Sequence, residues 1–306
     1  MTTETTPCTP VRAGHRLALL VTAVLAAGPA PAGEAINRRL AVEAAAQVEV
    51  ANVSGSVKVS GWNRNEVEVT GELGEGSERL EFATVDKVTR VKVVLPRNAR
   101  NVDGSELVIR MPAAGRLQVN TVSADIEVTG VGGAQRLVTI SGDLRTESGR
   151  EDVDCKTVSG DVAVNGRGER GLLNLNTVSG DVRVTNAAGE LNANTVSGDL
   201  AFELGVLDRS RLRSTSGDVT VGGQLGGEAR IDAESLSGDV RLHLRGPVAA
   251  EFDVATFSGE IRNCFGPKPK RDDEYAPGHS LRFREGPGGG RVRIKTMNGD
   301  IDLCRK

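Results

Sequence analysis

Nine acidic residues recur at one position of a repeated phrase, and they are the residues of this sequence best placed to do chemistry. The phrase reads Thr-Val-Ser-Gly-Asp-Val at residues 157–162 and again at 177–182. Two residues after its serine, or the equivalent position, stand Asp125, Asp143, Asp161, Asp181, Asp199, Asp218, Asp239, Glu260 and Asp300. Clustered carboxylates are ligands that calcium prefers, so the pattern raises the question of a metal.

Two explanations account for such a column. The first is a row of calcium ions, for which Asp161, Asp181, Asp199, Asp218 and Asp239 are the candidate ligands. The second is structural: each Asp accepts a hydrogen bond from a backbone N–H at its turn, which offsets a repulsion of about 1 kcal/mol per neighbouring pair. Calcium-binding solenoids repeat Gly-Gly-x-Gly-x-Asp, which this sequence lacks. We therefore favour the structural explanation and expect neither a metal nor a cofactor.

Nucleophilic catalysis finds little support among the serines of the phrase. A serine nucleophile needs a partnered base, and no histidine recurs at a fixed offset from these serines. Beyond residue 32 the histidines are His243 and His279. The Gly-rich stretch 286–291 lacks the Lys-Ser/Thr of a phosphate-binding loop and indicates a turn. We expect no catalytic residues.

Cys264 and Cys304 occupy equivalent places, each six residues after the reference residue of its repeat. If these two repeats are neighbours, with residues 265–290 looping out, the Cα atoms approach the roughly 5.5 Å that a disulfide requires. We expect this disulfide to hold the C-terminal repeat, which would lack a neighbour on one side. Cys155 falls in a column of aliphatic residues and should be a buried, unreactive side chain.

The elements that carry these residues are short strands in a regular series. The reference residues are Ser123, Ser141, Ser159, Ser179, Ser197, Ser216, Ser237, Ser258 and Asn298. A period near 20 residues is typical of stacked architectures. Around each bend apolar and polar residues alternate, as in strands with one buried face. The sequence predicts an all-β fold, a β-solenoid (β-helix) of about 18–21-residue coils, in which glycine at the bend allows unusual backbone conformations.

The chain divides into three expected parts. Residues 1–32 resemble a signal peptide, since Arg12 and Arg16 precede an apolar run and Ala30 and Ala32 fit cleavage between Ala32 and Gly33. Residues 33–115 are expected to form an N-terminal β cap, with Trp62 as a packing anchor or a ligand-stacking residue. Residues 116–306 carry the repeats, with a loop insertion at about 265–290. No second apolar run is long enough for a transmembrane span in the mature chain.

Charge excludes some partners. The net charge of −3 argues against nucleic acid as a partner. Arg145, Arg183, Arg241 and Arg262 lie on an outer face after the bend, which is either a mixed solvated face or a ledge for an acidic glycan or a partner. The loop 265–285 interrupts the repeat and is the best single place to expect a contact.

The sequence resembles the DUF4097 family of bacterial proteins, which are described as adhesin candidates. The resemblance rests on "NVSGSVKVSGWNRNEVEVTGEL", on "LVIRMPAAGRLQVNTVSADIEVTGV" and on the "TVSGDV" repeats, and it covers residues 45–306. It implies an exported β-solenoid without established catalytic residues.

We therefore expect a non-enzymatic cell-envelope protein, in the periplasm, at the cell surface or secreted. Its role would be that of an adhesin-like binding module or a rigid spacer. Its partner would be an envelope or host glycan or another envelope protein. The alternatives are a periplasmic structural or self-assembling solenoid and a carbohydrate-active β-helix enzyme.

Overall fold

The computed structural model describes residues 33–97, 102–271 and 277–305, and Gly33–Lys306 forms one compact unit. The expected signal peptide, with Ala32 of its cleavage site, lies outside the described residues. Within them every regular element is a β-strand, so the all-β prediction is confirmed. No helix in this part of the chain is long and apolar enough to cross a membrane.

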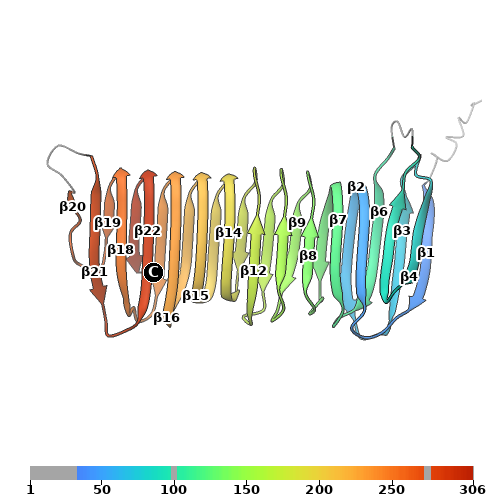
Figure 1. Ribbon diagram of the computed structural model, residues 1–306, viewed down its shortest axis with the longest axis horizontal. Coiled ribbons are helices and arrows are strands. Elements are labelled where there is room, and N and C mark those ends of the chain that lie inside the picture. The colour runs from blue at the N-terminus through green and yellow to red at the C-terminus, as the bar shows by residue number, and fades with distance from the viewer. Residues whose placement is uncertain (1–32, 98–101, 272–276, 306) are drawn as a thin grey trace, which may run out of the picture. The chain divides into compact units, whose positions relative to one another are not determined.

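The strands of the central region form stacked rungs, a rung being the two strand segments on either side of one bend (Figure 1). Neighbouring rungs pair in parallel along two ladders, β7–β8–β10–β12–β14–β15–β16 and β7–β9–β11–β13–β15–β16. This β-solenoid-like stack is the predicted fold class. The strands are β7 (Arg116–Thr129), β8 (Gln135–Val138), β9 (Leu144–Ser148), β10 (Val153–Lys156), β11 (Val162–Gly166), β12 (Arg170–Asn176), β13 (Val182–Thr185), β14 (Ala188–Ser197), β15 (Leu200–Ser216) and β16 (Val219–Ser237).

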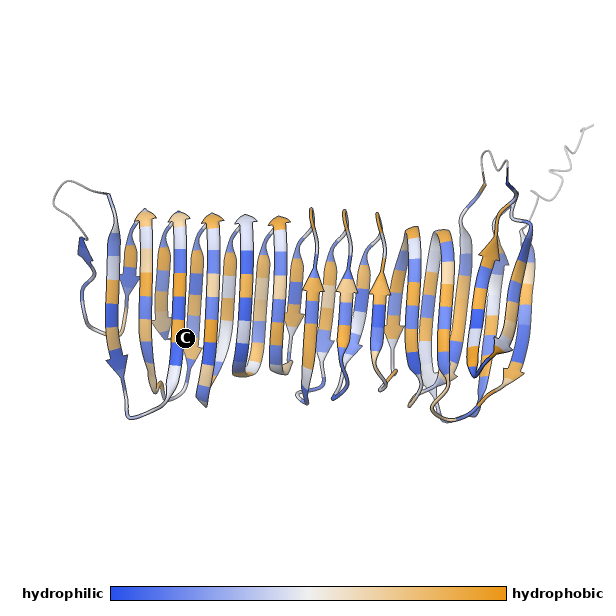
Figure 2. Ribbon diagram, viewed as in Figure 1, coloured by the Kyte–Doolittle hydropathy of each residue, from blue (hydrophilic) through white to orange (hydrophobic). Residues whose placement is uncertain are grey.

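The core is a set of apolar columns that run through the rungs. Residues alternate between buried and exposed along most strands. Figure 2 shows the matching alternation of hydrophobic and hydrophilic residues along the ribbon. One column contains Val119, Leu137, Cys155, Leu175, Ala193, Leu212, Ala233, Ile294 and Val254, all at most 1 % exposed. A single rung cannot bury its apolar side chains, so the core exists only because rungs stack.

The bends bring neighbouring rungs very close together. A Cβ added at Gly180 would lie 2.1 Å from the carbonyl oxygen of Gly160, and one at Gly160 would meet Gly142 at the same distance. Neither glycine has a positive φ. The sequence analysis explained glycine at the bend by its backbone freedom. At these two bends the reason is instead the close approach of the neighbouring rung, which leaves no room for a Cβ.

At the N-terminal end the order of rungs in space differs from their order in the chain. The strands are β1 (Glu34–Ala41), β2 (Gln47–Trp62), β3 (Glu66–Leu73), β4 (Arg79–Val85), β5 (Val88–Val94) and β6 (Ser105–Pro112). β2 is the first rung of the chain, yet it pairs in parallel with β5 and β6 on one side and with β7 on the other. Beyond β5 and β6 lie antiparallel strands: β4 pairs with β5, β3 with β6, and β1 with β3.

The C-terminal end repeats this arrangement with β17 (Val240–Arg245), β18 (Ala250–Ser258), β19 (Ile261–Asn263), β20 (Lys270–Arg271), β21 (His279–Glu285), β22 (Gly290–Asn298) and β23 (Ile301–Arg305). β22 pairs with both β16 and β18, and β23 with both β17 and β19. In Figure 1 the red strand β22 lies between the orange strands β16 and β18. The expectation that the C-terminal rung lacks a neighbour on one side is therefore wrong.

The segment expected to loop out also contains strands. β21 pairs antiparallel with β18, and β20 pairs with β21. Leu281 is buried, and the ring of Phe283 stacks on that of Phe252 with centroids 4.6 Å apart. The expected insertion therefore contains two strands besides its irregular stretches, and β21 covers apolar surface and pairs backbone groups that β18 would otherwise leave at the edge of the sheet.

Candidate functional site

The carboxylate column is a hydrogen-bonded ladder between rungs. The backbone N–H of Asp199 donates to Asp181 Oδ1 at 2.8 Å, and the N–H of Asp181 donates to Asp161 Oδ1 at 2.9 Å. The same bond links every neighbouring pair from Asp125 to Glu260. At the C-terminal end it runs from Asp239 to Asp300 and then to Glu260, which follows the order of rungs in space. The bond that offsets repulsion thus comes from the next rung rather than from the turn of the Asp itself.

The geometry favours this structural explanation over calcium. Arg241 extends across two rungs and hydrogen-bonds both Asp218 and Asp239 at 2.7 Å. Burial by itself would raise the pKa of Asp218, but the hydrogen bonds from Arg241 and the Asp239 amide outweigh it and lower that pKa. Nowhere in the described column do three carboxylates bring oxygens within 4.8 Å of one another. A calcium site needs six to eight oxygen ligands.

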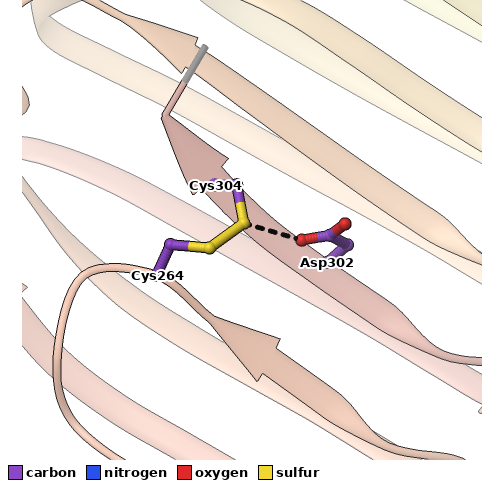
Figure 3. Close-up of side chains that lie close together, drawn as sticks. All are labelled: Cys264, Asp302 and Cys304. Carbon is purple, nitrogen blue, oxygen red and sulfur yellow. Dashed lines mark hydrogen bonds between the residues drawn. A yellow bond between two sulfur atoms is a disulfide. The ribbon is translucent and has the colours of Figure 1, made fainter.

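Cys264, the residue after β19, lies beside Cys304 of β23, and Figure 3 shows the two joined as a disulfide. Their Cα atoms are 4.9 Å apart and the S–S bond is 2.02 Å long. Asp302 Oδ1 lies 3.0 Å from Cys304 Sγ, and the carboxylate of Asp302 also pairs with Arg262. These three side chains are the one group in the described chain with metal-ligand spacing, but the sulfur atoms are committed to each other.

The remaining candidates for a nucleophile or a base, which are Cys155, His243 and His279, lie on separate strands. Cys155 is fully buried, and burial together with the charge of Asp154 raises the pKa of its thiol to about 12. His243 lies on β17, opposite Gly222 and Cys304. His279 begins β21 rather than lying in a loop, and its Nδ1 is 3.0 Å from the carbonyl oxygen of Gly259. No serine of the bends has a hydrogen bond to either imidazole in the described chain.

Trp62 and the expected arginine ledge are surface features. Trp62 donates from Nε1 to the carbonyl of Glu66, and the guanidinium groups of Arg64 and Arg110 lie over its ring at 5.1 and 5.9 Å. It is partly buried and packs against these two side chains, so its role as a packing anchor stays a prediction. Three of the four ledge arginines have carboxylate partners: Arg145 with Asp143, Arg241 with Asp218 and Asp239, and Arg262 with Asp302. The ledge is mostly a neutralised face.

Exposed apolar residues form a row at the position before the bend in every rung of the repeat except that of Ser216, where Thr215 stands. The sequence analysis missed this row. Its members are Val122, Ile140, Val158, Val178, Val196, Leu236, Met297 and Phe257, each 43–57 % exposed. The sequence signal was the valine of Thr-Val-Ser-Gly-Asp, which sits between the buried hydroxyl and the bend.

A second missed feature is a groove of about 850 Å³ on the outer face of the other ladder, over β14, β15, β16, β22, β18 and β21. Six arginines line it: Arg209, Arg211, Arg230, Arg282, Arg291 and Arg293. The carboxylates in its lining are Glu190, Asp232, Glu251 and Asp253. Six arginines against four carboxylates give the groove a positive charge on a chain whose net charge is −3.

Strand register explains how the arginines meet. Arg209 pairs in register with Arg230, and Arg230 pairs with Arg291, so three guanidinium groups stand on three adjacent strands. In the described residues Arg230 and Arg291 have no ion pair or side-chain hydrogen bond, and neither do Arg211 and Arg293. Like charges directly opposite each other destabilise a sheet. The sequence signal was the alternating arginines of "RSRLRS" and "RVRIK", but nothing in it placed β22 beside β16.

Comparison with known proteins places this stack in a family. The model of the family described as Toastrack DUF4097 matches residues 36–209 and 190–304. No curated protein matches the chain.

Crystal structures of low sequence identity are also similar. A "putative adhesin" from Bacteroides fragilis NCTC 9343 is 11% identical, covers 90% of this chain and 99% of its own, and gives a TM-score of 0.43. A "putative adhesin" from Parabacteroides distasonis ATCC 8503 (10%, coverage 89% and 98%, TM-score 0.33) and a "putative cell adhesion protein" from Clostridium sporogenes ATCC 15579 (11%, coverage 89% and 100%, TM-score 0.26) are less well superposed. The family model spans nearly the whole described stack, so the chain belongs to the Toastrack DUF4097 family.

Proposed function

We propose that this protein is an exported, non-enzymatic envelope protein that acts as an adhesin-like binding module rather than as a spacer. The observation that carries the proposal is the groove over β14–β22, in which unpaired arginines are held on adjacent rigid strands. A spacer needs only a stable stack and has no reason to retain like charges in register. A binding surface does, because a ligand of opposite charge relieves the repulsion.

Export is the second part of the proposal. Its support is the signal-like residues 1–32, followed by a compact unit that begins at Gly33. The disulfide between Cys264 and Cys304 suits an oxidising compartment. The stack itself is proposed to consist of coils of about 18–21 residues behind an N-terminal β cap formed by residues 33–115. The expected contact at 265–285 becomes part of this proposal through β21, which borders the groove.

Self-assembly through the ends is the weaker alternative. The outermost strands carry charges along their exposed edges, as in "EAINRRLA" of β1 and "RLEFATV" of β4. Charged edge strands oppose further strand pairing. The β-helix enzyme alternative would need a base close to carboxylates, and the described imidazoles stand apart from the carboxylates of the groove.

Protease treatment of intact and permeabilised cells tests the proposal. Surface display predicts cleavage on intact cells, and sequencing of the recovered N-terminus should begin at Gly33. Protection until the envelope is opened would contradict an adhesin-like role and favour a periplasmic structural one. A mature chain that retains residues 1–32 would contradict export through a cleaved signal.

A further inference from the structure

We propose that the groove over β14–β22 binds a linear acidic polysaccharide, whose carboxylate or sulfate groups are held by the arginine row Arg209–Arg230–Arg291. This inference rests on the proposed function, because a binding module of the envelope meets such polymers. It adds the site, the residues and the ligand class.

The first support is the like-charged row itself. Arg209, Arg230 and Arg291 are in register on β15, β16 and β22, and strands in a sheet lie about 4.8 Å apart. Glu190 lies before the row, where it pairs with Arg209 at 3.2 Å, and Glu251 lies after it. Arg230 and Arg291 therefore stand at the centre of the row without a carboxylate partner among the described residues. An anion bound there would satisfy both.

A second row supplies groups of both signs beside the first. Two residues further along the same strands, the order is Arg211, Asp232 and Arg293. Asp232 Oδ1 is buried and has no hydrogen-bond partner in the described structure. A buried acceptor without a donor is costly unless a ligand supplies the donor. Arginines can hold the acidic groups of a sugar, and a carboxylate beside them can accept hydrogen bonds from its hydroxyl groups, so the two rows suit an acidic sugar.

The direction of the rows fits a polymer rather than a single small anion. Both rows run across the strands, along the direction in which rungs stack, and the lining extends from Glu190 on β14 to Arg282 on β21. Arginine binds carboxylate and sulfate-like oxygens in a bidentate manner, so a row of them can hold successive acidic groups.

The lining argues against a nucleic acid. None of its thirteen side chains is aromatic, so bases would have nothing to stack on. The four carboxylates in the same lining need hydrogen-bond donors, and the backbone of a DNA strand has no hydroxyl groups between its phosphates. A polysaccharide with hydroxyl donors between its acidic groups makes use of them.

The test is binding of the purified exported chain to polygalacturonate, dextran sulfate, neutral dextran and single-stranded poly-dT, measured by calorimetry. We expect binding to polygalacturonate, dextran sulfate or both, and the two arms distinguish a carboxylate ligand from a sulfated one. The double variant Arg230→Gln, Arg291→Gln should weaken that binding by tenfold or more, an estimate on the order of one lost bidentate contact. The matched control is Arg183→Gln, an exposed arginine on β13 of the other ladder that lies between Ala163 and Ala201.

Folding is checked in the same samples. The double variant should melt at the same temperature as the unchanged chain or higher, since it relieves like-charge contact. The acidic polymer should raise the melting temperature of the unchanged chain and not that of the double variant.

Four results would overturn the inference: no binding to either acidic polymer, equal binding to neutral dextran, tighter binding to poly-dT, or equal loss in Arg183→Gln. Any of them would remove the ligand class, while cleavage on intact cells would still support the proposed function. Binding in vitro together with protection on intact cells would support the ligand class and contradict the adhesin-like function.

Discussion

The N-terminal end of the stack places β2, the first rung of the chain, between β5–β6 and β7. The C-terminal end places β22–β23, the last rung, between β16–β17 and β18–β19. Antiparallel strands then cover the outermost rung at each end: β4 and β3 at one, and β21 at the other. The order is the same, so it answers a need common to both ends, which is to keep a terminal rung from presenting a long, flat edge.

The chemistry that holds the two ends differs. At the N-terminal end, Glu68 of β3 is buried and pairs with Arg39 of β1 and Arg110 of β6. At the C-terminal end, a disulfide joins Cys264, just after β19, to Cys304 of β23, and Phe283 stacks on Phe252. The N-terminal end thus depends on a buried carboxylate, whereas the C-terminal end adds a covalent bond and an aromatic contact to exposed ion pairs such as Arg262–Asp302. Both ends therefore share an inserted rung, and they differ in the contacts that fasten it.

Removal of the disulfide should have the largest effect. The double variant Cys264→Ser, Cys304→Ser frees a 40-residue segment, and we expect a loss of about 2–4 kcal/mol in the free energy of unfolding. Urea unfolding should show this loss, and hydrogen exchange should place it in β18–β23 rather than in β1–β6. The pairing itself is checked by mass spectrometry of a digest without reduction. Equal exchange at both ends would contradict separate fastenings.

Removal of the buried carboxylate should weaken the opposite end. In Glu68→Gln the two arginines keep their solvent exposure but lose charge-assisted bonds, so we expect a loss of about 1.5–3 kcal/mol. The control is Arg64→Gln, which breaks the exposed pair with Glu66 and should cost less than about 1 kcal/mol. Faster hydrogen exchange in β1, β3 and β6, with exchange in β18–β23 unchanged, would support separate fastening of the two ends. A spread of the effect to the C-terminal end would contradict it.

The inserted rungs also show which features of the fold could be predicted from the sequence and which could not. The columns were predictable because every rung needs the same residue types at the same places. Val182 and Leu200 are examples of the buried aliphatic column, and Asp181 and Asp199 of the carboxylate column. The spatial order of the rungs was not predictable, because rungs that share the same columns of residues can stack on one another in more than one order. The one clue was the 40-residue interval before Asn298. The groove was hidden for this reason, since Arg230 and Arg291 meet only through the inserted β22.

A change in the middle of the stack separates rung packing from both fastenings. In Gly180→Ala the new Cβ would lie 2.1 Å from Gly160 O, so the rungs must move apart, and we expect a loss of about 1–3 kcal/mol. Gly227→Ala is the control, because a Cβ there has no heavy atom within 4 Å. Thermal unfolding of the two variants measures the difference. Equal stability would contradict the close approach as the reason for glycine at the bend.

The smallest expected effect concerns Arg241, which lies next to the inserted rung. Arg241 and the Asp239 amide lower the pKa of Asp218 below its ordinary 3.8, although burial opposes them. A carboxylate with a lowered pKa in the folded state stabilises the fold above its unfolded pKa, and this contribution is lost as pH falls through the folded value. Arg241→Gln should therefore be less stable than the unchanged chain at pH 7, by less than about 1 kcal/mol because Asp218 is 38% exposed. The gap should close as pH falls through the folded-state pKa of Asp218, because Asp218 is then protonated in both the variant and the unchanged chain. Urea midpoints across this range measure it, with Arg183→Gln as the control that should show no such closure. A gap that stays constant with pH would mean that Arg241 acts by packing rather than through the charge of Asp218.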